Sequence, residues 1–78
     1  MEIQAVVGRN VKRYRELKGV SQEELAFQSD LHRTYVSGVE RGIRNPTVAI
    51  VARLAVALGV SPAALLELQN NSQQGDIR

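Results

Sequence analysis

Apolar residues recur at three- and four-residue spacing through most of the chain, which is the repeat of amphipathic α-helices. The repeat predicts a first helix over residues 2–18, and Lys18 followed by Gly19 is a typical helix end. The apolar stripe of this helix consists of four residues: Ile3, Val7, Val11 and Tyr14.

Two short helices, 22–28 and 32–40, are predicted next, joined by a tight turn. Ser21 and Glu24 have the spacing of a capping box, in which the hydroxyl accepts from a backbone N–H and the carboxylate reaches back to the cap. Asp30 lies where the chain must turn, and aspartate tolerates left-handed backbone better than most residues. Helices this short need tertiary packing. The side chains expected to supply it are apolar: Leu25, Ala26, Leu31, Val36, Val39 and, partly buried, Phe27.

A fourth helix is predicted over residues 47–58, capped by Thr47, and a fifth over residues 62–69, capped by Ser61. The fourth helix is apolar nearly all round, with Arg53 as its only charge. One face holds Val48, Val51, Leu54, Ala55 and Leu58, and the other holds Ala49, Ile50, Val56 and Ala57.

A domain this small cannot easily cover both faces of such a helix, so a subunit interface is the natural cover. In the other interpretation the alanines are merely tolerated at the surface, against which Ile50 argues. The fifth helix also carries more leucines than one packed face requires. We therefore predict a homodimer with an interface of Ile50, Arg53, Leu54, Ala57, Leu66 and Leu68.

Length and composition indicate one all-α domain, a compact five-helix fold over residues 1–69, followed by a polar tail at 70–78 that we expect to be disordered. Apolar residues make up 44% of the chain and aromatic residues only 4%, which favours closely packed helices with aliphatic side chains. The absence of cysteine and the single histidine argue against a disulfide framework or a metal site. We find no signal peptide and no run that could cross a bilayer, so the expected location is cytoplasmic.

The formal net charge is only +2, but the charges are unevenly distributed. Residues 47–74 hold only Arg53 and Glu67, whereas the first half is basic. This separation predicts that one half meets a polyanion while the other packs or self-associates. In the first predicted helix, a solvated face and phosphate contact remain alternatives. The basic residues of the first half are Arg9, Lys12, Arg13, Arg15, Lys18, Arg33, Arg41 and Arg44.

The outer side of the predicted third helix carries small or hydrogen-bonding residues, which suits entry into the major groove of DNA. Arginine can donate two hydrogen bonds to guanine, so Arg33 is the expected main base reader. The loop at 41–46 holds Arg41, Arg44 and Asn45, which suit phosphate contact, although an ordinary polar loop would look similar. The other residues expected to meet DNA from this side are Thr34, Ser37 and Gly38.

Residues 8–66 closely resemble the helix-turn-helix regulators of the phage repressor and Cro superfamily, the XRE family. The stretch from Leu31 to Pro46 is most similar to the controller proteins of restriction–modification systems, small dimeric regulators that time expression of the endonuclease. The wider superfamily also includes other repressors and antitoxins. The resemblance is carried by GVSQEELA at 19–26, LHRTYVSGVERG at 31–42, RNPT at 44–47 and ALGVS at 57–61.

This resemblance implies a lambda-repressor-like fold with the helix-turn-helix motif at 21–40. Gln22 would contact a phosphate and steady a base-reading side chain, and Tyr35 would reach toward DNA. Arg15 and Glu40 match a charged pair that ties the first helix to the third in phage repressors. Asp30 stands where many relatives have glycine, and His32 is expected to be a cap or a neighbour of a phosphate.

The predicted function is a sequence-specific transcriptional regulator, repressor or activator, bound as a dimer to a near-palindromic operator. A protein-interaction module with this fold is the alternative, but it would be expected to lose the basic and polar residues of the third helix. No catalytic or metal-binding constellation argues for an enzyme. The expected partners are double-stranded DNA, a second copy and, as a further candidate, RNA polymerase, with no cofactor, small-molecule ligand or membrane.

Overall fold

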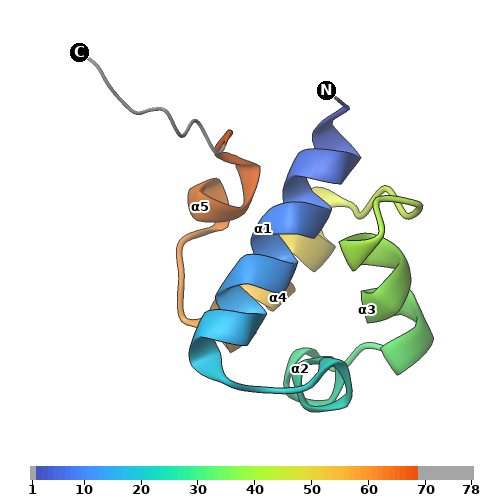
Figure 1. Cartoon of the computed structure of the whole chain (residues 1–78), viewed down its shortest axis with the longest axis vertical. Coiled ribbons are helices and arrows are strands. Elements are labelled where there is room, and N and C mark those ends of the chain that lie inside the picture. Colours follow the sequence, from blue (N-terminus) through green and yellow to red (C-terminus); the bar gives the residue numbers. More distant parts are fainter. Residues whose placement is uncertain (1, 69–78) are drawn as a thin grey trace.

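The computed structural model describes residues 2–68, and within them the chain forms five helices and no strand, as predicted (Figure 1). The fifth helix ends at Leu66 rather than at residue 69, because Glu67 is extended. The prediction for the tail at 70–78 lies outside the described residues. The helices are α1 (Ile3–Lys18), α2 (Gln22–Ser29), α3 (Arg33–Glu40), α4 (Val48–Leu58) and α5 (Pro62–Leu66).

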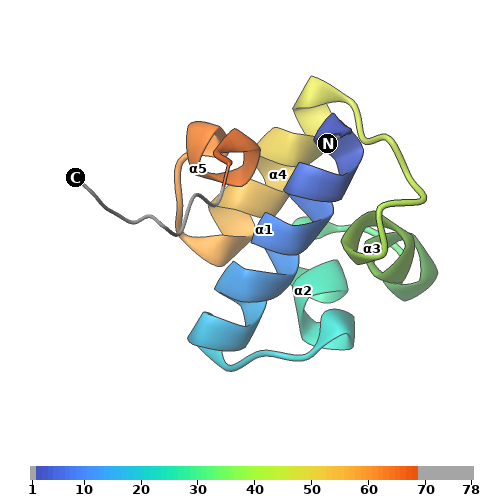
Figure 2. The ribbon, with the colours of Figure 1, turned by 45° about the horizontal axis from the view of Figure 1, so that its top comes forward.

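Helix α1 lies across the middle of the molecule and packs against α3, α4 and α5 (Figures 1 and 2). Helix α2 packs between α3 and α4 at one end. Aliphatic side chains from all five helices fill the space between them, in agreement with the low aromatic content. The fully buried residues with the largest side chains are Leu25, Leu54, Leu65, Val11, Val36, Val39 and Asn10.

Local sequence signals set the ends of the helices. The hydroxyls of Ser21, Thr47 and Ser61 each accept a hydrogen bond from the backbone N–H three residues on, which confirms the three predicted caps. The second half of the predicted capping box differs from the prediction. Instead of reaching back to the cap, the Glu24 carboxylate accepts a hydrogen bond from Gln28 Nε2 at 2.7 Å. Helices α1, α2 and α4 end in left-handed residues, namely Gly19, Asp30 and Gly59.

The prediction that Phe27 is partly buried is wrong. Phe27 is 81% exposed, because the buried side of α2 consists of Leu25, Ala26 and Ser29. Val48 is 86% exposed, although spacing placed it on one face of α4 with residues that are buried. Spacing assigns residues to a face, but the neighbouring helices decide how wide the covered face is.

Three predicted interface residues lie on the covered side of α4. Leu54 is 0% exposed and Ala57 is buried, so the core of a single chain covers both, which contradicts their assignment to a subunit interface. Ile50 is half-buried and packs against the same core. The exposed apolar side of α4 is instead formed by Val48, Ala49 and Val56, with Ala52 half-buried beside them.

Asn10 is a buried polar residue of α1 that the sequence pattern did not single out. Its amide Nδ2 donates to the backbone carbonyls of Leu65 at 2.9 Å and Glu67 at 2.8 Å. Leu65 lies in the last turn of α5 and Glu67 is its C-cap, so neither carbonyl has a partner within the helix. Asn10 therefore anchors the end of α5 to the middle of α1.

Candidate nucleic-acid interface

Helices α2 and α3 are joined by a three-residue turn whose conformation follows from local hydrogen bonds. Asp30 is left-handed, with φ 58° and ψ 45°, as its position in the sequence predicted. The backbone N–H of Leu31 donates to the carbonyl of Ala26 at 2.8 Å, which closes the end of α2. His32 caps α3, because its Nδ1 accepts from the N–H of Thr34 at 3.1 Å. Residues 30–32 are thus the whole connection between the two helices, and α3 begins directly after them at Arg33.

The outer side of α3 presents polar side chains while its inner side is fully buried. Val36 and Val39 have no exposed surface and fix the helix against the core. Residues three and four apart share a helix face, so one exposed stripe runs along the opposite side. Arg33, Thr34 and Arg41 are exposed and Ser37 is half-buried. The structure therefore brings together four of the residues predicted to meet DNA: Arg33, Thr34, Ser37 and Arg41.

Tyr35, Gly38 and Arg44 form the flank of this surface. The guanidinium carbon of Arg44 lies 5.6 Å from the centre of the Tyr35 ring, a cation–π distance. Tyr35 is half-buried, and it packs against the core as well as against Arg44. Gly38 is buried, which contradicts the expectation that it faces a groove in DNA. Its Cα is covered by the aliphatic stem of Arg44.

The loop after α3 is held to the helix by the backbone. Gly42 takes a left-handed conformation, with φ 77°, and turns the chain back along α3. The carbonyl of Gly38 then accepts from the N–H groups of both Ile43, at 3.0 Å, and Arg44, at 3.3 Å. Arg44 and Asn45 are both exposed, as phosphate contact requires, but only Arg44 packs against α3. Asn45 lies at the apolar groove described below.

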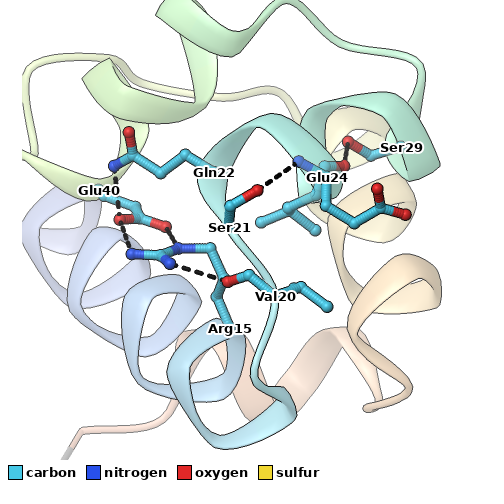
Figure 3. Close-up of polar contacts among 8 residues, drawn as sticks. Arg15, Val20, Ser21, Gln22, Glu24, Ser29 and Glu40 are labelled. Carbon is cyan, nitrogen blue, oxygen red and sulfur yellow. Dashed lines mark hydrogen bonds and ion pairs between the residues drawn. The ribbon is translucent and has the colours of Figure 1, made fainter.

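Figure 3 shows the ion pair between Arg15 and Glu40 that the family resemblance implies. A third residue, Gln22, joins this pair. Arg15 Nε donates to Glu40 Oε2 at 2.6 Å and Nη2 donates to Oε1 at 3.1 Å. Gln22 Nε2 also donates to Glu40 Oε1, at 2.9 Å. Arg15 closes the network through the carbonyl of Val20. One carboxylate therefore links α1, the start of α2 and the end of α3.

The network has two electrostatic consequences. The hydrogen bond that Glu40 accepts raises the pKa of Arg15 above its ordinary value, against the lowering effect of burial. The Glu40 side chain is only 3% exposed and its charge is balanced by Arg15. Between Leu31 and Thr47 the exposed charged side chains, Arg33, Arg41 and Arg44, are therefore all positive.

Arg53, predicted to lie in the dimer interface, binds the turn between α2 and α3. Its Nε donates to the carbonyl of Ser29 at 3.1 Å, and its Nη2 donates to the carbonyl of Asp30. The Asp30 carboxylate lies 3.8 Å from the same guanidinium. A cation that binds the last carbonyls of a helix also stabilises the negative end of its dipole. Sequence spacing gave no sign of this cap, because the two elements are 23 residues apart.

An apolar groove lies between the start of α1, the start of α4 and α5. Leu66, predicted to lie in the dimer interface, is 46% exposed at its edge. The sequence pattern did not reveal this groove, because the residues that line it come from α1, the loop after α3, α4 and α5. It is lined by Ile3, Gln4, Val7, Asn45, Pro46, Val48, Val51, Ala52, Pro62 and Leu66.

A comparison with protein families agrees with the arrangement of α2 and α3. The family model described as Helix-turn-helix matches residues 11–74. The chain belongs to this XRE-type helix-turn-helix family. The matched residues include α2, the turn and α3, and the network of Arg15, Gln22 and Glu40 links these two helices to α1.

The relatives of this helix-turn-helix chain include restriction–modification control proteins. The control protein C.BamHI of Bacillus amyloliquefaciens is 46% identical over 66 residues, which cover 83% of this chain and 82% of the relative. The crystal structure of the controller protein C.AhdI from Aeromonas hydrophila is 45% identical and has a TM-score of 0.77, with 80% of this chain and 90% of that chain covered.

A second solved structure bears on the recognition helix. The controller protein C.Esp1396I, crystallised as a tetramer in complex with its natural 35 base-pair operator, is 37% identical with a TM-score of 0.76. The match covers 83% of this chain and 86% of that chain. The chain therefore shares its fold with a protein that has been crystallised in complex with operator DNA.

Other kinds of site are not evident in the described part of the helix-turn-helix chain. Residues 2–68 contain no group of three histidine, cysteine, aspartate or glutamate side chains arranged to hold a metal ion. Over the same residues, every helix is too short or too polar to cross a membrane.

Proposed function

We propose that this chain is a sequence-specific DNA-binding transcriptional regulator, and specifically the controller protein of a restriction–modification system. The similarity to C.BamHI and C.AhdI over four fifths of the chain or more supports the controller assignment. The observation that carries the DNA-binding role is the uniformly positive charge of the exposed ionised groups on α3 and its loop. A cationic, polar surface on a short helix suits the major groove.

Arg33 would supply most of the sequence specificity. It is exposed on the first turn of α3, with Thr34 and Ser37 on the same side. An arginine reads guanine through O6 and N7, while a threonine can place its methyl group against thymine. The remaining affinity would come from phosphate contacts by residues at the edges of this surface: Gln22, Tyr35, Arg41, Arg44 and Asn45.

Gln22 would contact a phosphate from a fixed position. One N–H of its amide is already committed to Glu40, so the other N–H of Nε2 is the donor left for DNA. Its Oε1 would repel a phosphate oxygen, since both are acceptors. The ion pair between Arg15 and Glu40 thus orients Gln22 toward DNA, although in this arrangement neither Arg15 nor Glu40 contacts DNA itself.

A dimer on a near-palindromic operator is the second part of the proposal, because one such domain buries too little surface for tight specific binding. The interface we propose is the apolar groove with Val48, Ala52 and Leu66, extended by the exposed Leu68. C.Esp1396I was crystallised as a tetramer in complex with its operator, which is consistent with association of this fold on DNA.

A mobility-shift experiment tests the proposal directly. The probe is the DNA upstream of the coding gene, and the competitors are unrelated duplexes of equal length. Arg33→Ala should weaken operator binding by about 1–3 kcal/mol and relax preference at one base pair of each half-site. If Arg33→Ala weakens binding to all sequences equally, Arg33 contacts a phosphate and the base-reading role is wrong.

The remaining assignments follow from this function. The alternatives within the family are another XRE-type repressor or an antitoxin, which the genes adjoining the coding gene would distinguish. RNA polymerase is a further candidate partner if the protein activates transcription. We assign no catalytic activity, because the relatives named above are regulators. A cytoplasmic location follows, since the operator DNA of a bacterial regulator lies there.

A further inference from the structure

The side chain of Arg44 occupies the space where a side chain at Gly38 would lie. A methyl group in place of the Gly38 hydrogen would lie 2.7 Å from Arg44 Cγ and 3.2 Å from its Nε. Both distances are shorter than ordinary van der Waals contact, so the stem of Arg44 occupies the space that a side chain at Gly38 would need.

This packing determines where the charge of Arg44 lies. The Gly38 carbonyl fixes the start of the arginine by accepting the N–H of Arg44, and the Tyr35 ring receives the guanidinium 5.6 Å from its centre. Tyr35 precedes Gly38 by one helical turn, so the side chain of Arg44 runs back along α3 toward its N-terminal end. That end also carries Arg33 and Thr34, which are exposed.

We propose that Gly38 is a positioning residue for DNA binding: by lacking a side chain it lets Arg44 lie across α3 and hold its guanidinium beside Tyr35, at the flank of the outer side of the helix. Gly38 itself does not touch DNA in this arrangement, because it is buried. The proposal rests on the DNA-binding function proposed above. It goes beyond that function by assigning Arg44 a fixed place on α3 instead of a free place in the loop.

Gly38→Ala separates this role from a structural one. Glycine in the middle of a helix is less favourable than alanine, and the three atoms nearest to the new methyl group belong to the exposed side chain of Arg44. The variant should therefore keep or raise the melting temperature. Its DNA affinity should fall about tenfold, the size of one charge-assisted hydrogen bond.

A double-mutant cycle with Arg44→Ala provides the test. The probe is a duplex selected by the wild-type protein from a random-sequence pool, and fluorescence anisotropy gives Kd over a range of salt concentrations. Arg44→Ala alone should weaken binding and reduce the slope of log K against log salt by about 1. Gly38→Ala should do the same, and Gly38→Ala added to Arg44→Ala should change Kd less than about twofold, since the side chain it displaces is already absent.

Two outcomes would overturn the inference. Equal losses of affinity from Gly38→Ala with and without Arg44 would mean that DNA approaches Gly38 itself. A lower melting temperature that Arg44→Ala does not restore would mean that the methyl group meets the backbone. Failure of the wild-type protein to select any duplex would instead refute the proposed function, on which this inference depends.

Discussion

Gly8 of α1 lies directly against the backbone of Val39 near the end of α3. A methyl group at Gly8 would lie 2.2 Å from the Val39 carbonyl oxygen and 2.9 Å from that of Glu40. The two helices therefore approach more closely than any side chain at this position would allow. Because α3 carries the residues proposed to read DNA, the glycine also sets the distance of the recognition helix from the core.

Gly8→Ala is expected to destabilise the fold by about 1–3 kcal/mol, the usual cost of overpacking, despite the better helix propensity of alanine. Denaturant unfolding followed by circular dichroism would measure the change. Gly38→Ala is the matched control, since its methyl group meets a flexible side chain instead of backbone. Equal stabilities of the two variants would show that α3 moves away from α1 at little cost.

Glu40→Ala should cost about 3 kcal/mol of unfolding free energy, because it leaves the largely buried Arg15 without its partner and frees Gln22. The double variant Arg15→Met with Glu40→Met should lose less than either single substitution, since it leaves no unpaired charge. Thermal unfolding and operator binding are measured together. Normal thermal stability with weakened binding would assign Glu40 to the DNA surface.

Arg53→Met keeps the length of the side chain but removes the donors that hold the Ser29 and Asp30 carbonyls. We expect a loss of about 1 kcal/mol in stability, the typical contribution of a cationic cap at a helix end. Operator affinity should also fall, because the turn that orients α3 is loosened. Sedimentation equilibrium should give an unchanged dimer constant; a shift to monomer would return Arg53 to the subunit interface first predicted from the sequence.

Leu66→Glu is expected to yield monomers with weak operator binding, because a charge at the edge of the apolar groove cannot be buried against a second copy. Val48→Glu should act in the same way from α4. Phe27→Glu is the control, since Phe27 is about as exposed as Val48 but does not line the groove. Sedimentation velocity distinguishes the three variants, and dissociation only with Phe27→Glu would move the interface to α2.

The sequence by itself determined the helices, their caps and the division of charge. Ser21, Thr47 and Ser61 bond to groups three residues away, and Asp30 adopts the turn conformation that its residue type tolerates. Such features depend on neighbours along the chain, so local pattern is sufficient to predict them. The exposed positions of Arg33, Thr34 and Arg41 followed for the same reason, from their spacing opposite Val36 and Val39.

Only the tertiary structure decided which apolar surfaces are covered and which long-range contacts form. Spacing showed that α4 has two apolar faces, but the packing of α1, α2 and α5 against one of them placed Leu54 in the core and Val48 in solvent. Likewise, Gly38 and Arg53 have roles that depend on an arginine stem and on two carbonyls brought together by folding. A repeat of three to four residues fixes which side chains share a face, and only the neighbouring elements fix what that face meets.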